Sequence, residues 1–214
     1  SGDTAELDLI LQHIFQNTRY ERIYLGGFSM SANLLLKYLG EKSQNIDPRI
    51  KAAFAFSAPV DLKSSCQQIS RGLSRIYEQN FLTSLKQKVH AKESMYERAE
   101  LNELNKLRRL KDFDNIFTAP LHGFQNSDDY YEKASSKPYL KEIKTPTLIV
   151  NALNDPFLAN ECYPIDEAKK NPLLTLELPE KGGHLGFCFD SAKGVYWSER
   201  KALTFLEEVQ EHQK

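Results

Sequence analysis

RIYLGGFSMSANLLLKYLG, residues 22–40, is the stretch of sequence that decides the fold. Its apolar first part, 22–28, predicts a buried strand, and the leucine-rich part from 30 to 39 predicts a helix that ends at Gly40. Ser29 stands between the two, at a junction that any turn-forming pair could make. A polar residue placed there, among glycines and small side chains, indicates that Ser29 is presented to something outside the turn.

Three more apolar runs predict buried strands, and segments with helical periodicity lie around them. The strands are expected at 50–59, 145–153 and 173–179, and the helices at 4–16, 160–170 and 195–209. Continuous apolar strands that are separated by helices indicate a parallel sheet, because the connecting helices cover both of its faces. The predicted fold class is therefore α/β.

Residues 61–140 break this alternation. They contain no convincing strand, and their leucines recur at three-residue spacing from Leu101 to Leu110. The span is too long for an ordinary crossover between strands. We therefore expect an α/β core formed by 1–60 and 141–214, with 61–140 as a helical subdomain inserted over one edge of the sheet. Most aromatic side chains of this insertion are expected to pack inside it, and a minority to line a pocket.

The order of the elements is unusual at its start, because a helix opens the chain and only four strands are expected after it. Four parallel strands would leave a strand with an exposed edge. The pattern is that of the later part of a larger fold, with the first strands absent or supplied by another segment. An exposed edge would also favour pairing with another chain, so the sequence is compatible with an oligomer.

The composition is that of a globular protein, with 41% hydrophobic and 27% charged residues in 214. The net charge of −1 gives no electrostatic reason to expect a nucleic acid as a partner. No apolar run approaches the roughly 20 residues of a membrane-spanning helix, and no signal-peptide pattern precedes the first helix. We therefore expect a cytoplasmic protein without a transmembrane segment.

The cysteines and the acidic residues show no pattern that predicts disulfide, redox or metal chemistry. Cys66, Cys162 and Cys188 are odd in number and unrelated in spacing, which is typical of reduced thiols in the cytoplasm. None belongs to a Cys-x-x-Cys pair, and no run of hard ligands has the spacing of a calcium loop. The sequence predicts neither a metal nor an organic cofactor.

The chemistry-bearing pattern is a strand, Gly27-x-Ser29-x-small, and then a helix, which is the nucleophile elbow of α/β-hydrolases. The strict pattern has glycine where Ser31 stands, but Ser31 is small enough for the tight turn. The Met30 amide would lie at a helix N-terminus, which suits an oxyanion. The alternative is that Ser29 merely caps the helix.

A serine hydroxyl needs a histidine to take its proton and an acid to orient that histidine. His184 lies in the glycine-bordered loop KGGHLGF after the last strand, whereas the other four histidines lie on helices, in the insertion or near the chain end. Asp155 directly follows the strand at 145–153, at the sheet end where parallel-sheet sites assemble. Asp61, after the preceding strand, is the rival acid. The favoured set is Ser29, Asp155 and His184, in the chain order of α/β-hydrolases.

The chain resembles the YheT-type hydrolases, an esterase-like and lipase-like group of the α/β-hydrolase superfamily. The likeness covers nearly the whole chain and is carried by GFSMSANLLLKYLGE (27–41), FDNIFTAPLHGFQNSDDYYEKASS (113–136), NALNDPF (151–157) and GGHLGF (182–187). It implies a triad of Ser29, Asp155 and His184, a lid formed by 61–140, and carboxylic esters with acyl or hydrophobic groups as substrates. It also implies an N-terminal portion that supplies the first strands and a second oxyanion donor, so that Met30 is the one donor evident in this chain.

The predicted function is a serine hydrolase of the carboxylic ester class (EC 3.1.1) that works through an acyl-enzyme. Thioesterase or peptidase chemistry uses the same acyl-transfer machinery and stays open. The alternative is a catalytically impaired or non-catalytic ligand-binding module, which the missing N-terminal portion and the departure at Ser31 would favour.

Overall fold

The structure, a computed structural model, describes residues 3–187 and 194–212. Four parallel strands form one sheet in the order β1-β2-β3-β4. The strands are β1 (Ile23–Phe28), β2 (Ile50–Phe56), β3 (Thr147–Val150) and β4 (Leu174–Glu177). Each lies inside an apolar run of the sequence, so the predicted α/β class and the parallel sheet are confirmed. Among the described strands, β1 pairs with β2 alone and therefore forms one edge of the sheet.

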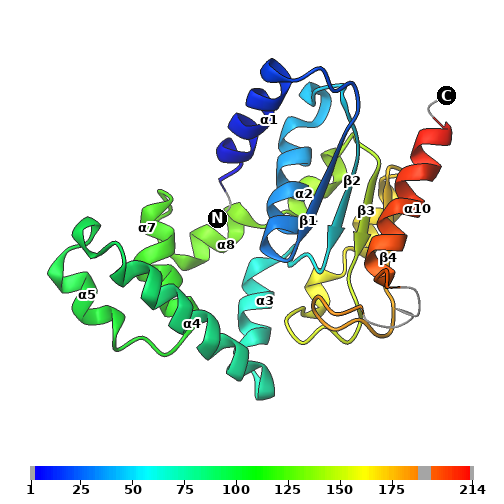
Figure 1. Ribbon diagram of the computed structural model, residues 1–214. Coiled ribbons are helices and arrows are strands. Elements are labelled where there is room, and N and C mark those ends of the chain that lie inside the picture. Colours follow the sequence, from blue (N-terminus) through cyan, green and yellow to red (C-terminus); the bar gives the residue numbers. More distant parts are fainter. Residues whose placement is uncertain (1–2, 188–193, 213–214) are drawn as a thin grey trace.

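Helices cover both faces of the sheet (Figure 1). One face packs against α1 (Ala5–Asn17), α2 (Met30–Lys42) and α9 (Ile165–Lys170), and the other packs against α10 (Trp197–His212). Within the part of the chain that the structure describes, no helix combines the length and the apolar character needed to cross a membrane.

The two faces are separated by the alternation of side chains along each strand. On β2, Ala53 and Ala55 belong to the apolar cluster beneath α2, whereas Ala52 and Phe56 belong to the cluster beneath α10. Successive side chains of a strand point to opposite faces, so a strand that is buried on both sides reads as a continuous apolar run. Burial on both faces explains why the apolar runs in the sequence predict the positions of these strands.

Gly40 does not end its helix, and that prediction is wrong. The helix α2 continues to Lys42, and Gly40 lies buried inside it. A Cβ atom at this position would lie 2.4 Å from the Tyr139 carbonyl oxygen. The glycine is therefore required by the close approach of the segment around Tyr139 and not by the end of the helix.

Residues 61–140 contain helices and turns but no strand. Two apolar clusters lie within this segment, apart from the two clusters on the sheet. Its helices are α3 (Leu62–Ile69), α4 (Arg75–His90), α5 (Arg98–Leu104), α6 (Leu110–Phe113), α7 (Ala119–Leu121) and α8 (Ser127–Ala134), with a π-helical turn at Asp114–Thr118. Figure 1 shows α4, α5, α7 and α8 grouped to one side of the sheet and its covering helices.

One buried side chain joins this segment to the core. Asn33 on α2 is fully buried, donates to the Ala134 carbonyl at 2.8 Å and accepts from the Ser136 amide at 2.9 Å. Both contacts go to backbone groups at the end of α8. The end of the segment is thereby fixed against the helix that begins directly after Ser29.

Candidate active site

Ser29 occupies a sharp turn between β1 and α2. Its backbone has φ 54° and ψ −124°, a region that residues with a side chain rarely adopt. The turn is tight because a Cβ atom on Gly27 would lie 2.7 Å from the Ala32 Cα atom and 2.8 Å from the Ser31 carbonyl oxygen. Only glycine fits there, so the sequence places Gly27 and Ser29 as the turn requires.

Ser31, the small residue two positions after Ser29, takes part in the same turn. The Ser31 hydroxyl donates to the Phe28 carbonyl at 2.7 Å and accepts from the Phe28 amide at 3.2 Å. The departure from glycine at this position therefore adds a contact across the turn. Ser29 itself makes no capping hydrogen bond to α2, so its hydroxyl is not used as a helix cap.

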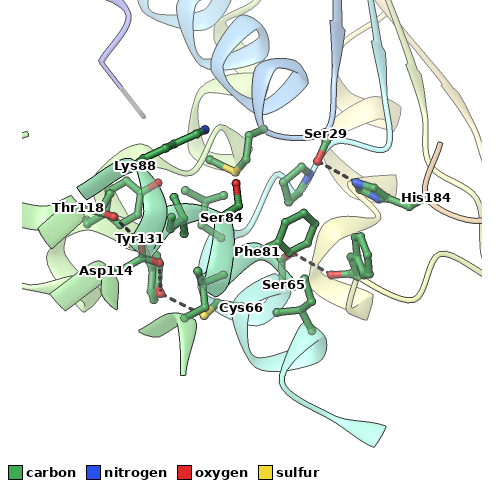
Figure 2. Close-up of a pocket in the computed structure, with 18 residues that line it drawn as sticks. Ser29, Ser65, Cys66, Phe81, Ser84, Lys88, Asp114, Thr118, Tyr131 and His184 are labelled. Atoms are coloured by element: carbon green, nitrogen blue, oxygen red, sulfur yellow. Dashed lines mark hydrogen bonds between the residues drawn. The ribbon is translucent and has the colours of Figure 1, made fainter. Parts of the chain in front are cut away.

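Three side chains from distant parts of the chain meet in a hydrogen-bonded row. His184 Nε2 lies 2.8 Å from Ser29 Oγ (Figure 2), and His184 Nδ1 lies 2.8 Å from Asp155 Oδ2. The Asp155 side chain is fully buried, while 14% of the His184 side chain is exposed. The structure thus brings together the three residues that the sequence favoured, in the order that a serine–histidine–acid relay requires.

The turn after β3 holds Asp155 in place. Its Oδ1 accepts from the Phe157 amide at 2.9 Å, which leaves Oδ2 for the histidine. Before it, the buried Asn151 side chain bonds both backbone groups of Ala58 and donates to the Cys162 carbonyl at 2.8 Å. These bonds join the ends of β2 and β3 directly before the turn that carries the Asp155 carboxylate.

The loop that carries His184 is held by residues that the sequence did not reveal. The Gly183 amide donates to Asn154 Oδ1 at 2.9 Å, and the Ser57 hydroxyl donates to the His184 carbonyl. The Phe157 ring lies 4.4 Å from the imidazole, measured between ring centroids. Asn154 and Phe157 flank Asp155 in NALNDPF, which is the one sequence signal that could have pointed to them.

The other candidates have different roles. Asp61, the rival acid, caps α3 by accepting from the Ser64 amide at 2.8 Å. His13 contacts Asn17 on its own helix, and His212 contacts the Glu208 carbonyl. Neither the rival acid nor these two histidines is part of the row formed by Ser29.

A cavity of about 360 Å³ opens beside Ser29 and His184. Most of its other lining comes from residues 61–140, and Phe157 lines it from the core. Its apolar lining comes from Met30, Pro59, Leu62, Ile69, Phe81, Leu85, Leu110, Tyr130 and Phe157. In Figure 2 the pocket extends from the Ser29–His184 pair toward side chains of the helical segment. Of the aromatic residues in 61–140, Phe81, Tyr130 and Tyr131 line it, whereas Phe113 and Phe117 pack in a cluster with α4 and α5.

The side of the pocket away from Ser29 carries a buried polar group (Figure 2). Asp114 accepts from the Thr118 hydroxyl and from the Tyr131 hydroxyl, each at 2.7 Å, and Tyr131 also contacts Cys66 Sγ at 3.1 Å. Burial raises the pKa of Asp114, and it raises the pKa of the Cys66 thiol to about 11. The polar side-chain groups of Asp114, Thr118, Tyr131 and Cys66 are therefore partners of one another.

Comparison with known proteins agrees with this geometry. The family model described as alpha/beta hydrolase fold matches residues 3–191. The chain belongs to the alpha/beta hydrolase family. Among solved structures, the chain resembles the Pyrococcus furiosus esterase Pf2001 with a TM-score of 0.57, 14% identity and coverage of 98% of this chain and 62% of that one. At that identity the likeness concerns the fold alone.

Curated relatives are similar to this member of the alpha/beta hydrolase family over most of its length. It is 31% identical to YheT of Escherichia coli over 87% of this chain and 55% of that protein. It is 32% identical to a monoacylglycerol lipase of Saccharomyces cerevisiae over 96% of this chain and 46% of the relative. It is 28% identical to the human phospholipase ABHD3 over 99% of this chain and 52% of the relative. The chain spans about half the length of these relatives. The predicted likeness to esterase-like and lipase-like hydrolases is confirmed.

Beside the Ser29–His184–Asp155 row, the start of α2 offers a backbone amide of the kind that stabilises an oxyanion. The Met30 amide belongs to the first turn of α2, whose N–H groups have no partner within the helix and lie at the positive end of its dipole. Within the described residues, no group of three or more histidine, cysteine, aspartate or glutamate side chains is arranged to hold a metal ion. The polar side chains that line the pocket with Ser29 and His184 include Ser65, Ser84 and Lys88.

Proposed function

We propose that this hydrolase is a serine esterase that cleaves carboxylic esters through an acyl-enzyme, with Ser29, His184 and Asp155 as its catalytic triad. The observation that carries the proposal is the position of His184, whose two ring nitrogens each lie 2.8 Å from a partner, Ser29 Oγ on one side and Asp155 Oδ2 on the other. A histidine bonded in this way can take the serine proton while the buried carboxylate stabilises the imidazolium.

In the first half-reaction, Ser29 Oγ attacks the ester carbonyl carbon as its proton passes to His184 Nε2. The carbonyl oxygen becomes an oxyanion, which the Met30 N–H stabilises at the helix N-terminus. The carbon–oxygen bond to the alcohol then breaks, and His184 gives the proton to the leaving alcohol. In the second half-reaction, water loses a proton to His184 and attacks the acyl-serine ester. The proton returns to Ser29 as the carboxylic acid leaves.

The pocket supports an ester with a hydrophobic acyl group. Its lining is mostly apolar, and burial of each methylene group contributes about 0.8 kcal/mol to binding of such a chain. We propose that residues 61–140 act as the lid of this acyl site, since α3, α4 and α8 supply much of its wall. One relative is named for monoacylglycerol and another for phospholipids, so the proposed ester class includes glycerol esters with and without a phosphate.

A fluorophosphonate probe tests the nucleophile directly. We expect one covalent adduct on Ser29, found by mass spectrometry of the digested protein, and Ser29-dependent release of nitrophenol from p-nitrophenyl hexanoate. Ser31→Ala is the matched control, because it removes a neighbouring hydroxyl and leaves that of Ser29.

The same proteins distinguish the proposed esterase from the alternative, a non-catalytic ligand-binding module. If the folded wild-type protein and Ser29→Ala bind the same ester with equal affinity and neither hydrolyses it, the protein is a ligand-binding module and the proposed esterase is rejected.

A further inference from the structure

Among the described residues of the pocket wall, Lys88 is the charged side chain that has no ion pair or hydrogen bond. It lines the same cavity as Ser29 and His184, is exposed, and has no ion pair or hydrogen bond from its ammonium group to any described residue. His184 is bonded to Ser29 and Asp155, and Asp114 is bonded to Thr118 and Tyr131. His184 and Asp114 therefore have partners, whereas the Lys88 ammonium has none within residues 3–187 and 194–212.

The helix α4 holds Lys88 toward the pocket. Phe81, Ser84, Leu85 and Lys88 all line the cavity, and their spacing places them on one face of the helix. Figure 2 shows the Lys88 side chain running along the pocket, with its ammonium nitrogen directed toward the side on which Ser29 lies. Its orientation therefore follows from the same helix face that builds the wall.

The chemistry of an unpaired ammonium beside an apolar wall indicates its ligand. Such a group attracts an anionic oxygen, and the attraction is stronger next to a low-dielectric wall than in open solvent. Lys88 is exposed and its ammonium is directed toward the side on which Ser29 lies, so it can reach the alcohol part of an ester whose acyl chain packs against the apolar wall. We propose that Lys88 is a specificity residue that selects esters whose alcohol part carries an anionic oxygen group, phosphate or carboxylate. This inference rests on the proposed esterase function.

The test compares two substrates with the same scissile ester. Hexanoate release is measured from monohexanoylglycerol and from monohexanoylglycerol phosphate, both below their critical micelle concentrations. Wild-type protein is expected to have the higher kcat/KM for the phosphate. In Lys88→Met the ratio of the two kcat/KM values should fall roughly tenfold, the scale of one charge-assisted hydrogen bond at a partly exposed site. A hemisuccinate of monohexanoylglycerol, as a third substrate, distinguishes a carboxylate from a phosphate.

Two further variants separate charge from structure. Lys88→Arg should keep the preference, and Lys88→Glu should reverse it. Lys92→Met is the matched control, because Lys92 is an exposed lysine just beyond α4 that does not line the cavity. Added sodium chloride should lower the substrate ratio of the wild type toward that of Lys88→Met, since salt screens exposed charges.

The outcomes for the two proposals differ. Ser29-dependent hydrolysis with the same substrate ratio in wild type, Lys88→Met and Lys88→Glu would overturn the role of Lys88 and leave the esterase standing. Absence of Ser29-dependent hydrolysis for all three esters would overturn both.

Discussion

At the residue scale, the position of Ser29 in the turn between β1 and α2 depends on a strained backbone conformation and on a neighbouring glycine. Its positive φ carries a strain of order 1–3 kcal/mol that the surrounding structure must hold. Gly27 makes that possible, because the backbone of Ser31 and Ala32 occupies the space where a side chain would be. The two residues are therefore coupled, one strained and the other unable to carry a Cβ atom.

Gly27→Ala should disturb this turn. The new methyl group would lie within 3 Å of three backbone atoms, which cannot rotate away. We expect a loss of about 1–3 kcal/mol in the free energy of unfolding and roughly a 10²-fold loss of esterase activity, because Ser29 would shift. Urea unfolding and p-nitrophenyl hexanoate hydrolysis measure the two effects. Gly123→Ala is the control: unlike Gly27, Gly123 has a positive φ and open space around it, so this variant should lose stability and keep activity.

Asp155→Asn should preserve the turn after β3 and remove the charge. The amide oxygen can still accept from the Phe157 amide, but the side-chain nitrogen then faces His184 and favours the wrong tautomer of the imidazole. We expect kcat to fall on the order of 10³- to 10⁴-fold, with the thermal midpoint close to that of the wild type. Activity near the wild-type value would contradict the role given to Asp155.

The Cys66 thiol should react slowly with alkylating reagents although it lines the pocket. Burial raises its pKa to about 11, so its thiolate fraction near pH 8 is on the order of 10⁻³, and the thiolate is the reactive form. Iodoacetamide should therefore alkylate Cys66 much faster in urea than in the folded protein, and raising the pH should accelerate the native reaction. Mass spectrometry measures both alkylation rates. Equal rates in the folded and unfolded protein would show that the Cys66 thiol is not buried and that its pKa is not raised.

At the scale of the elements, the Asn33 side chain on α2 forms two buried hydrogen bonds to the end of the helical segment. Asn33→Leu keeps a similar volume but leaves the Ala134 carbonyl and the Ser136 amide without their partner in a buried place. Each unsatisfied group costs about 1–3 kcal/mol, so the two together should lower the free energy of unfolding by about 2–6 kcal/mol. Asn17→Ala, on the exposed end of α1, is the control and should change it by less than about 0.5 kcal/mol. A small effect of Asn33→Leu would mean that the segment is held mainly by other contacts.

The sequence predicted the strands and the position of the site because both follow from regular rules. Buried parallel strands are continuous apolar runs, and their carboxyl ends meet at one edge of the sheet, so Asp155 and the turn at Ser29 could be expected to lie near each other. Gly40 was misread because its partner, Tyr139, lies far along the chain. Asn154, Phe157 and Ser57 were missed because their contacts depend on loop conformations that local propensity does not determine.

At the scale of the whole molecule, the pocket exists only where two parts of the chain meet. The core contributes Ser29, Phe157 and His184, and the helical segment contributes walls from α3, α4 and α8. Neither part encloses the cavity alone. The segment between β2 and β3 supplies most of the pocket wall, which is the surface that an acyl chain would contact under the proposed function.

This arrangement predicts that a bulky side chain on α4 shortens the pocket. Ser84 lines the cavity and Thr83, its neighbour on the same helix, does not, so Ser84→Trp and Thr83→Trp form a matched pair. If the indole of Ser84→Trp excludes about two methylene groups, at about 0.8 kcal/mol each, the ratio of kcat/KM for p-nitrophenyl hexanoate over the acetate should fall roughly tenfold. Thr83→Trp should keep the wild-type ratio. Equal ratios in all three proteins would mean that the acyl chain binds outside this cavity, whereas a selective loss in Ser84→Trp would place the chain between the sheet and the helical segment.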